Sequence, residues 1–309
     1  MFRLGIGPRI LGRAALRRQT EPREGEPGPQ ASQQLQLRDA LRYLGGLGVG
    51  GYRLPDTLAA PDGTQPDAAL GAALGAQART CGIRLSFHPG LHTALAAPDA
   101  AVAQAALAEV ERCAALLDAL AAADGVIVLH VGGAQGGHEA ALARFAARHA
   151  ALSARARHYV AVEADDHSFD IAALLWLART CRVPLIFDSL HFQLHNPQRL
   201  RLDEALGLAL ATWPAGRRPK IHLSTQRTEA HLRPGRGGRG DQIIPPRRGQ
   251  HADFLNPFEV AALLRQAHGL GQFDIMIEAK AADLALLRLR DDLRTLAPDV
   301  AALEEPPHV

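Results

Sequence analysis

Three short apolar runs between residues 159 and 224 constrain the fold of this chain more than any other feature. They are Tyr159–Glu163, Pro184–Asp188 and Pro219–Ser224, and the segment Ile171–Ala178, whose apolar residues have helical spacing, separates the first two. Runs that are apolar throughout are typical of strands buried on both faces of a parallel sheet. The pattern therefore predicts parallel β/α units, whose functional side chains gather at the carboxyl ends of the strands.

The rest of the chain repeats this alternation. Further strands are predicted at 2–6, 51–54, 83–88, 126–131 and 273–278. Helices are predicted at about 35–44, 67–80, 99–123, 138–151 and 282–296, with Asp99 as an N-cap. Eight strands alternating with helices favour a closed barrel over an open sheet, and no Gly-x-Gly-x-x-Gly motif follows the first strand. The expected fold class is α/β, a (β/α)8 TIM barrel forming a single domain over 1–309, with mobile loops near 19–33 and 226–256.

Size and composition place few further limits on the chain. A length of 309 residues suits one such barrel, and no apolar run reaches the length of a membrane span. The Arg-rich amino terminus lacks the pattern of a signal peptide. Three widely spaced cysteines, an odd number, argue against a disulfide framework and for a reducing compartment. We therefore expect a cytoplasmic monomer without a membrane partner, and the net charge of +2 neither requires nor excludes nucleic acid.

Imidazole and carboxylate groups accumulate where the predicted strands end. The set comprises His88, His130, Glu163, Asp188, His191, Lys220, His222 and Glu278, with His251 from the connection after the seventh strand. Such ligands suit Zn, Mn or Fe, and the absence of cysteine argues against a closed structural zinc site. One ion takes about four to six ligands, so the set indicates two or three ions bridged by Glu163 and Glu278. Clustered metals suit the in-line displacement of a phosphoryl group.

Each of these residues also has a structural interpretation. A single strand-end histidine such as His130 is often only hydrogen-bonded, whereas Asp188 and His191 follow one strand and can reach the same ion. Lys220 and His222 lie two residues apart on a strand and point to the same side. An ammonium would repel cations there. Lys220 must therefore pair with carboxylates, reach a phosphate, or carry a modification that makes it acidic.

Two connections are rich in arginine and are expected on the same rim as the metal ligands. They carry Arg9, Arg13, Arg17 and Arg18 after the first strand, and Arg227, Arg233, Arg236, Arg239, Arg247 and Arg248 after the seventh. Together they could bind phosphates, although a high-GC genome also scatters arginine in solvated loops. Tyr52, Phe192 and Phe254 are the aromatic candidates for contacts with bases. Backbone contact and bending are favoured over direct reading of bases.

The motifs that carry these residues resemble the UV damage endonucleases of the UvsE/UVDE family. The similar blocks follow in family order through most of the chain: Ile83–Gly90, Leu129–Gly133, Val162–Asp166, Leu185–His191, Thr212–Trp213, Lys220–Ser224, His251–Asp253 and Ile275–Lys280. The resemblance implies a barrel akin to endonuclease IV and xylose isomerase, and cleavage of the phosphodiester on the 5′ side of a damaged nucleotide in double-stranded DNA.

The same resemblance assigns roles to individual residues. The implied metal ligands are His88, His130, Glu163, Asp188, His191, His222, His251 and Glu278. The implied catalytic residues are Glu163, Lys220 and Glu278, and Lys220 is implied to become carboxylated. The implied cofactor is two or three divalent ions, with manganese preferred over zinc, magnesium or cobalt. The predicted DNA contacts are Leu91, His92, Arg227, Arg233 and Arg247.

The chain departs from the family pattern where the family reads its lesion. Leu91 and His92 follow His-Pro-Gly in place of glutamine and an aromatic residue, although Leu91 could still act as an apolar wedge between bases. Further departures are Gly5-Ile6, Glu163-Ala164-Asp165 and Arg53-Leu-Pro-Asp56. Hydrolytic metal chemistry is thus better supported than specificity for UV photoproducts. The alternatives are a sugar isomerase or epimerase with two metals, and a DNA-binding relative that does not incise.

Overall fold

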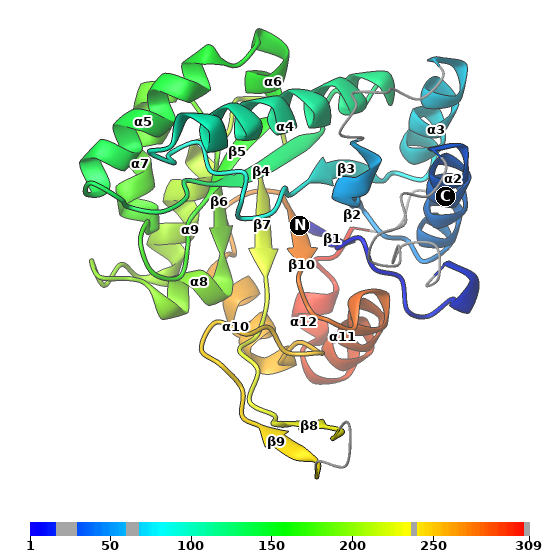
Figure 1. Ribbon diagram of the computed structural model, residues 1–309. Helices are drawn as coiled ribbons and strands as arrows, with labels where there is room; N and C mark the ends of the chain where they lie inside the picture. The colour runs from blue at the N-terminus through cyan, green and yellow to red at the C-terminus, as the bar shows by residue number, and fades with distance from the viewer. Residues whose placement is uncertain (17–29, 60–67, 236–239, 306–309) are drawn as a thin grey trace.

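The closed parallel barrel predicted for this chain is confirmed by a computed structural model, which describes residues 1–16, 30–59, 68–235 and 240–305 (Figure 1). Its strands follow one another around the barrel as β1 (Phe2–Ile6), β2 (Gly51–Arg53), β3 (Arg84–Phe87), β4 (Val126–His130), β5 (Val160–Glu163), β6 (Leu185–Asp188), β7 (Lys220–Leu223) and β10 (Phe273–Ile277). Parallel pairing of Phe2 with Phe273 through Ile6 with Ile277 closes the barrel between the two ends of the chain.

Helices connect the strands and cover the outside of the barrel. The longer ones are α2 (Gln30–Gly46), α3 (Ala68–Thr80), α4 (Ala100–Ala119), α5 (His138–Ala151), α7 (Ile171–Cys181), α9 (Leu202–Ala211), α10 (Pro257–Gln266) and α11 (Ala282–Leu296). Shorter ones are α6 (Ala154–Tyr159), α8 (Ser189–Leu194) and α12 (Pro298–Ala301), with a 3-10 turn at Asp56–Leu58. The predicted N-cap is present, because the Asp99 side chain accepts a hydrogen bond from the amide of Val102. None of the described helices is both long and apolar enough to cross a membrane.

Two apolar clusters hold the layers together. The larger one lies between the helices and the outward-facing strand residues, for example Leu129, Val162 and Phe187, all of which are fully buried. Because successive strand residues face opposite sides of a sheet, the alternate residues point into the barrel. There Val126, Val128, Ala161, Ile186 and Trp213 form a second apolar cluster. It fills the half of the barrel interior that β4, β5 and β6 enclose.

The other half of the interior is charged. Asp274 on β10 receives three guanidinium groups: Arg3 at 2.8 Å, Arg84 at 2.9 Å and Arg218 at 2.9 Å. The register places Arg3 beside Asp274 on the neighbouring strand, and Arg84 reaches across from β3. The guanidinium groups of Arg84 and Arg217 lie over the Trp213 ring, 5.5 and 5.4 Å from its centroid. One buried carboxylate thus compensates several cations at the amino-terminal end of the barrel.

Several local predictions differ from the structure. Tyr159 ends helix α6 and does not begin β5, while α8 and α9 were not predicted. Helix α2 starts at Gln30, inside the segment 19–33 predicted as a loop, and residues 17–29 lie outside the described part of the chain. The connection 226–256 contains an antiparallel ribbon of β8 (His231–Arg233) and β9 (Gln242–Ile244), which extends beyond the carboxyl ends of β7 and β10 (Figure 1). Cys81, Cys113 and Cys181 form no disulfide.

Asp274→Asn should destabilise the fold strongly, because it leaves buried guanidinium groups without their counterion. We expect a loss of about 3–5 kcal/mol in the free energy of unfolding, measured by denaturant titration. Asp299→Asn is the matched control. The Asp299 carboxylate pairs with Arg265 on the surface, both side chains more than half exposed, and its loss should change the stability little. Equal costs for the two variants would contradict the role given to Asp274.

Candidate metal centre

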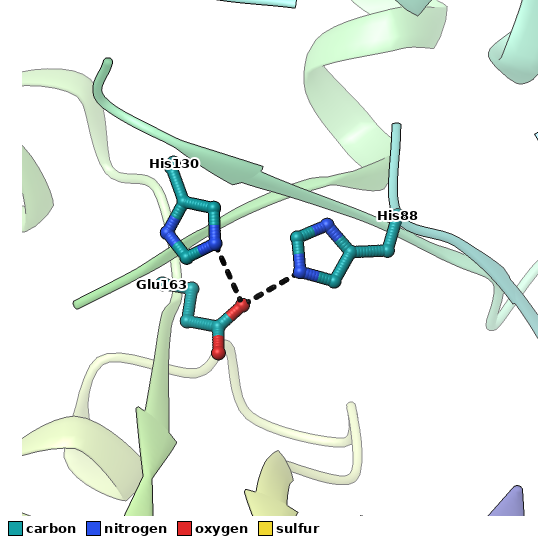
Figure 2. A group of neighbouring side chains, drawn as sticks. All are labelled: His88, His130 and Glu163. Carbon is teal, nitrogen blue, oxygen red and sulfur yellow. Dashed lines mark ion pairs between the residues drawn. The ribbon is translucent and has the colours of Figure 1, made fainter. Parts of the chain in front are cut away.

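The predicted ligands meet at the carboxyl ends of the barrel strands. The register aligns His130 with Glu163 and Asp188 with His222 on neighbouring strands, so these side chains lie at similar heights. His88 follows β3 directly, and Glu278 follows β10. Figure 2 shows His88 and His130 directed at the same carboxylate oxygen of Glu163. The strand geometry alone therefore brings residues far apart in the sequence into one group.

Glu163 lies at the centre of this group and is buried. Its Oε2 is 2.9 Å from His88 Nε2 and 3.6 Å from His130 Nε2 (Figure 2). Its Oε1 is 3.0 Å from His222 Nδ1 and 3.5 Å from His191 Nδ1. A carboxylate with two imidazoles beside each oxygen has the arrangement that a ligand bridging two cations requires.

Glu278 forms a second centre beside the first. His222 Nδ1 lies 3.4 Å from Glu278 Oε1, and His251 Nδ1 lies 3.9 Å from Glu278 Oε2. Arg53 from the end of β2 donates from Nη1 to Glu278 Oε1 at 2.5 Å. His222 therefore connects the two carboxylates. Ligand atoms of Glu163, Asp188, His222 and Glu278 all lie within 4.8 Å of one another.

Backbone groups fix the orientation of the remaining ligands. Asp188 Oδ1 accepts hydrogen bonds from the amides of Leu190 and His191, which makes Asp188 the N-cap of α8. His191 Nδ1 lies 2.9 Å from the carbonyl oxygen of Ala164 and donates to it; His251 Nδ1 does the same to Glu278 O at 2.8 Å. A ring that donates from Nδ1 keeps the Nε2 lone pair for a metal, so these bonds select the ligating tautomer.

Buried polar atoms without hydrogen bonds show where cations fit. Oδ2 of Asp188 and Nε2 of His222 have no hydrogen-bond partner among the described residues, and neither have the Nδ1 atoms of His88 and His130. Such atoms are costly to bury unless a partner compensates them. Asp188 and His222 belong, with Glu163 and Glu278, to a group whose oxygen and nitrogen donor atoms lie within 4.8 Å of one another, and such donors suit Mn²⁺ and Zn²⁺. The chain therefore offers a site that fits divalent metal ions.

The pKa values of the buried carboxyl groups depend on the charges of their neighbours. Burial alone would raise the pKa of Glu163, but the imidazoles of His222 and His130 hold it well below the ordinary value. The pKa of Glu278 falls to about 2, because His222 and Arg53 outweigh its burial. Burial raises the pKa of Asp188, which the nearby Glu163 charge reinforces. Protons and cationic side chains thus balance the acids when no metal is bound.

Lys220 lies one layer deeper, two residues before His222. It is buried, and its Nζ donates to Ser86 Oγ at 2.6 Å. Burial, followed by the charge of Arg84, lowers the pKa of Lys220 to about 7. Among the interactions proposed from the sequence, direct pairing with a carboxylate is absent from the described contacts of Lys220. A Lys220 near neutrality removes much of the repulsion expected between an ammonium and the metals above it.

The predicted DNA contacts fall into two groups. Leu91 is 79% exposed, and His92, Arg233 and Arg247 are also exposed. Arg227 is only 5% exposed, and its guanidinium bonds the Glu229 carbonyl, Asp253 and His231. The placement of Arg227 thus suits a structural role within the seventh connection, and its contact with DNA stays a prediction. Arg17, Arg18, Arg236 and Arg239 lie outside the described residues.

Sequence reasoning missed two residues of the site and misplaced two aromatics. Arg53 was noted only as a departure from the family pattern, although it holds Glu278. Ser86 lies two residues before His88, so the period of a strand would have placed both on the inner face. Tyr52, proposed for the rim, is 1% exposed and donates to the carbonyl of Pro8. Phe192 is partly buried and packs against the core.

A match to a family model identifies the protein family of this chain. The model for UV-endonuclease UvdE matches residues 66–303, which include every predicted metal ligand. The chain belongs to this family. The UV DNA damage endonuclease of Bacillus velezensis is 29% identical over 268 residues, or 83% of this chain and 78% of the relative. That of Bacillus cereus (strain G9842) is 29% identical over 72% of this chain and 66% of the relative.

Solved structures similar to this UvdE-family chain support the barrel. SacUVDE superposes with a TM-score of 0.76 at 22% identity, covering 96% of this chain and 99% of that structure. Endonuclease IV from Thermus thermophilus gives a TM-score of 0.61 at 16% identity, over 95% and 99% of the two chains. The 3-keto-D-glucoside 4-epimerase YcjR from E. coli gives 0.58 at 13% identity, over 96% and 100%. Nucleases and epimerases share the fold, so the fold alone does not select the reaction.

Metal binding by this UvdE-family chain should release protons at neutral pH. Burial would lower the pKa of His191, but the carboxylates of Asp188 and Glu163 raise it to about 9. A raised pKa means that the proton is held below about pH 9 and must leave before the ring can ligate. Affinity for Mn²⁺ should therefore rise with pH and level off above about pH 9. Calorimetric titration of chelator-treated protein in buffers of different ionisation enthalpy measures the released protons.

Two variants sharpen this measurement. His191→Gln should release fewer protons at neutral pH and bind Mn²⁺ more weakly. His158→Gln should behave as wild type, because His158 bonds the carbonyl of Ala123 at the opposite end of the barrel. Proton release that is unchanged in His191→Gln would show that His191 does not ligate.

Proposed function

We propose that this protein is a metal-dependent DNA repair endonuclease that hydrolyses the phosphodiester on the 5′ side of damaged nucleotides. The observation that carries the proposal is the buried Glu163 carboxylate between four imidazoles, at the functional face of a UvdE-family barrel. Its relatives are named UV DNA damage endonucleases. Sites with several clustered divalent cations are suited to phosphodiester hydrolysis.

The side chains would divide the work as follows. Glu163 and Glu278 would bridge cations, while the five histidines and Asp188 would complete the coordination. When bound, the divalent ions supply Lewis-acid activation of the phosphodiester and of water. Arg53 holds the Glu278 carboxylate in place from one side and His222 from the other. The bonds from His191 and His251 to backbone carbonyls keep their rings oriented before substrate arrives.

Double-stranded DNA is the substrate that the charges on the rim favour. The exposed Arg233 and Arg247 lie on the connection that also carries the ligand His251. A polyol substrate would not need arginines extending from the barrel on a β-ribbon, whereas a phosphate backbone would. The epimerase alternative therefore draws support from the fold alone, and the nuclease proposal from the fold, the family and the rim together.

We further propose that Lys220 becomes N-carboxylated, as the family resemblance implies. The Nζ lone pair would attack carbon dioxide and lose a proton, giving a carbamate. A pKa near 7 leaves a substantial neutral fraction for that attack. The carbamate would replace a cation by an anion beneath the metals. Intact mass measured with and without bicarbonate tests this, and Lys220→Met, which cannot be carboxylated, serves as the control.

Glu278→Gln should abolish incision and leave DNA binding nearly unchanged. The amide keeps the size and the bond to Arg53 but loses the charge and the bridging capacity, so we expect a loss of at least about 100-fold in the cleavage rate. Glu259→Gln, an exposed carboxylate on α10, is the control and should cleave as wild type. Cleavage by Glu278→Gln at the wild-type rate would refute the bridging assignment.

Removal of metal should stop the reaction reversibly. The substrates are UV-irradiated, abasic and undamaged plasmid, incubated with protein that is chelated and then resupplied with Mn²⁺. We expect nicking of damaged plasmid by the reloaded protein only. Nicking of none of the three by protein with measured metal content would remove the nuclease proposal, and incision on the 3′ side would refute the cleavage position.

A further inference from the structure

Two exposed aromatic side chains follow the predicted metal ligand His251: Phe254 on the same connection, and Phe258 in the first turn of helix α10. Phe254 is 48% exposed and Phe258 is 67% exposed. We propose that these two residues, here named the aromatic rim, stack on an unpaired base of the DNA beside the metal centre. The inference rests on the proposed function, because it supplies that site with its contact to the nucleobase. It places base recognition on the seventh connection, not on the residues after His88.

The backbone that carries Phe254 is fixed to the ends of two barrel strands. The amide of Ala252 donates to Thr225 O at 2.9 Å, just after β7, while Ala252 O and Asp253 O accept from the amides of Lys280 and Ala281, just after Glu278, at 3.0 and 2.9 Å. The next side chain, Leu255, is buried in the core. Phe254 thus projects from a segment held between the strands that bear His222 and Glu278. A surface aromatic in a fixed position is suited to stacking, because little conformational entropy is lost on contact.

Phe258 is held by a helix cap at the same rim. The Asn256 side chain accepts hydrogen bonds from the amides of Phe258 and Glu259 and so begins helix α10. The amide of Asn256 in turn donates to Thr225 Oγ1 at 3.0 Å. Phe258 therefore occupies the first turn of α10, at the end facing the carboxyl termini of the strands. Its ring is the more exposed of the two and contributes little to the core.

Charged side chains near the aromatic rim are of both signs: Glu259, next to Phe258, is an exposed carboxylate that accepts from Asn256 Nδ2 at 3.1 Å. The Asp253 carboxylate, adjacent to Phe254, is paired with Arg227 Nη1 at 3.2 Å. That pairing offsets the one acidic side chain next to Phe254 in the sequence. The same connection exposes the guanidinium groups of Arg233 and Arg247. Aromatic faces beside cations are the combination that binds single-stranded nucleic acid, with bases on the rings and phosphates on the arginines.

An unstacked base fits this surface better than an intact duplex. Within a duplex both faces of every base are covered, so only base edges and the backbone are accessible. Damage that weakens stacking lowers the cost of exposing a base face. Stacking on phenylalanine also tolerates different bases, since every base has a π-face. The aromatic rim would therefore recognise disturbed stacking and not one lesion chemistry.

Base fluorescence tests the assignment without relying on incision. The probe is a DNA duplex with one abasic site and 2-aminopurine beside it, titrated with Glu278→Gln protein so that no cleavage occurs. We expect a rise in fluorescence on binding. In the Glu278→Gln protein, a second substitution, Phe254→Ala or Phe258→Ala, should abolish most of the fluorescence rise and weaken DNA binding by about five- to 150-fold. Trp176→Ala, which removes an aromatic that is 45% exposed on the outer helix α7, should change neither quantity.

The outcomes separate this inference from the proposed function. Phe258→Trp should show the fluorescence rise that Phe258→Ala loses. If Phe258 had only a structural role, a larger ring would not rescue the rise. Unchanged fluorescence and affinity in both alanine variants, with wild-type melting temperatures, would overturn the aromatic rim. A loss confined to Leu232→Ser with Ile243→Ser would assign the contact to the β8–β9 ribbon and overturn it equally. A rise that depends on both phenylalanines, in a protein that nicks no plasmid, would retain this inference and refute the nuclease.

Discussion

The buried carboxylate of Glu163 sets the requirement that the rest of the site satisfies. A carboxylate without water or a counterion is among the most costly groups to bury. Here Asp188 and Glu278 stand close by, and each raises the free energy of the others. The imidazoles around them can offset that charge by binding protons, or can leave it to cations and act as ligands. Protons and metal ions would bind the same ring nitrogens, so each would displace the other at this site.

Charged side chains inside the barrel, below these carboxylates, also contribute to the charge balance. Its charged half places Arg3, Arg84 and Arg218 around Asp274, with Lys220 between that cluster and the metal ligands. Burial, followed by the charge of Arg84, depresses the pKa of Lys220, and Ser86 is its hydrogen-bond partner. Gly5 allows β1 to approach β2 closely, since a Cβ at this position would lie 2.7 Å from the carbonyl oxygen of Gly51. The apolar half of the interior, around Trp213, keeps water from the opposite side.

The sequence predicted what strand geometry dictates and missed what loop geometry decides. Residues that end a parallel strand must face the same rim, so the positions of His130, Glu163 and Asp188 followed from pattern alone. The burial of Tyr52 and of Arg227 was not foreseen, because the burial of a side chain depends on neighbours far away in sequence, such as Pro8 and Asp253. The β8–β9 ribbon was overlooked because its strands are only three residues each. Short elements leave too little periodicity to detect.

This division between strands and loops also separates the predicted metal ligands from the predicted DNA contacts. The ligands are borne by strand ends whose backbone is fixed by barrel hydrogen bonds, so a change there would disturb both fold and metals. Leu91 and His92 follow a strand end and are exposed, and their replacement costs the fold little. The connection after β7 has both properties, because it carries His251 and is also tied to β10 through Ala252 and Asp253. A residue on that connection that contacts DNA would keep its position relative to the predicted metal site. A residue on a loop without such hydrogen bonds would not.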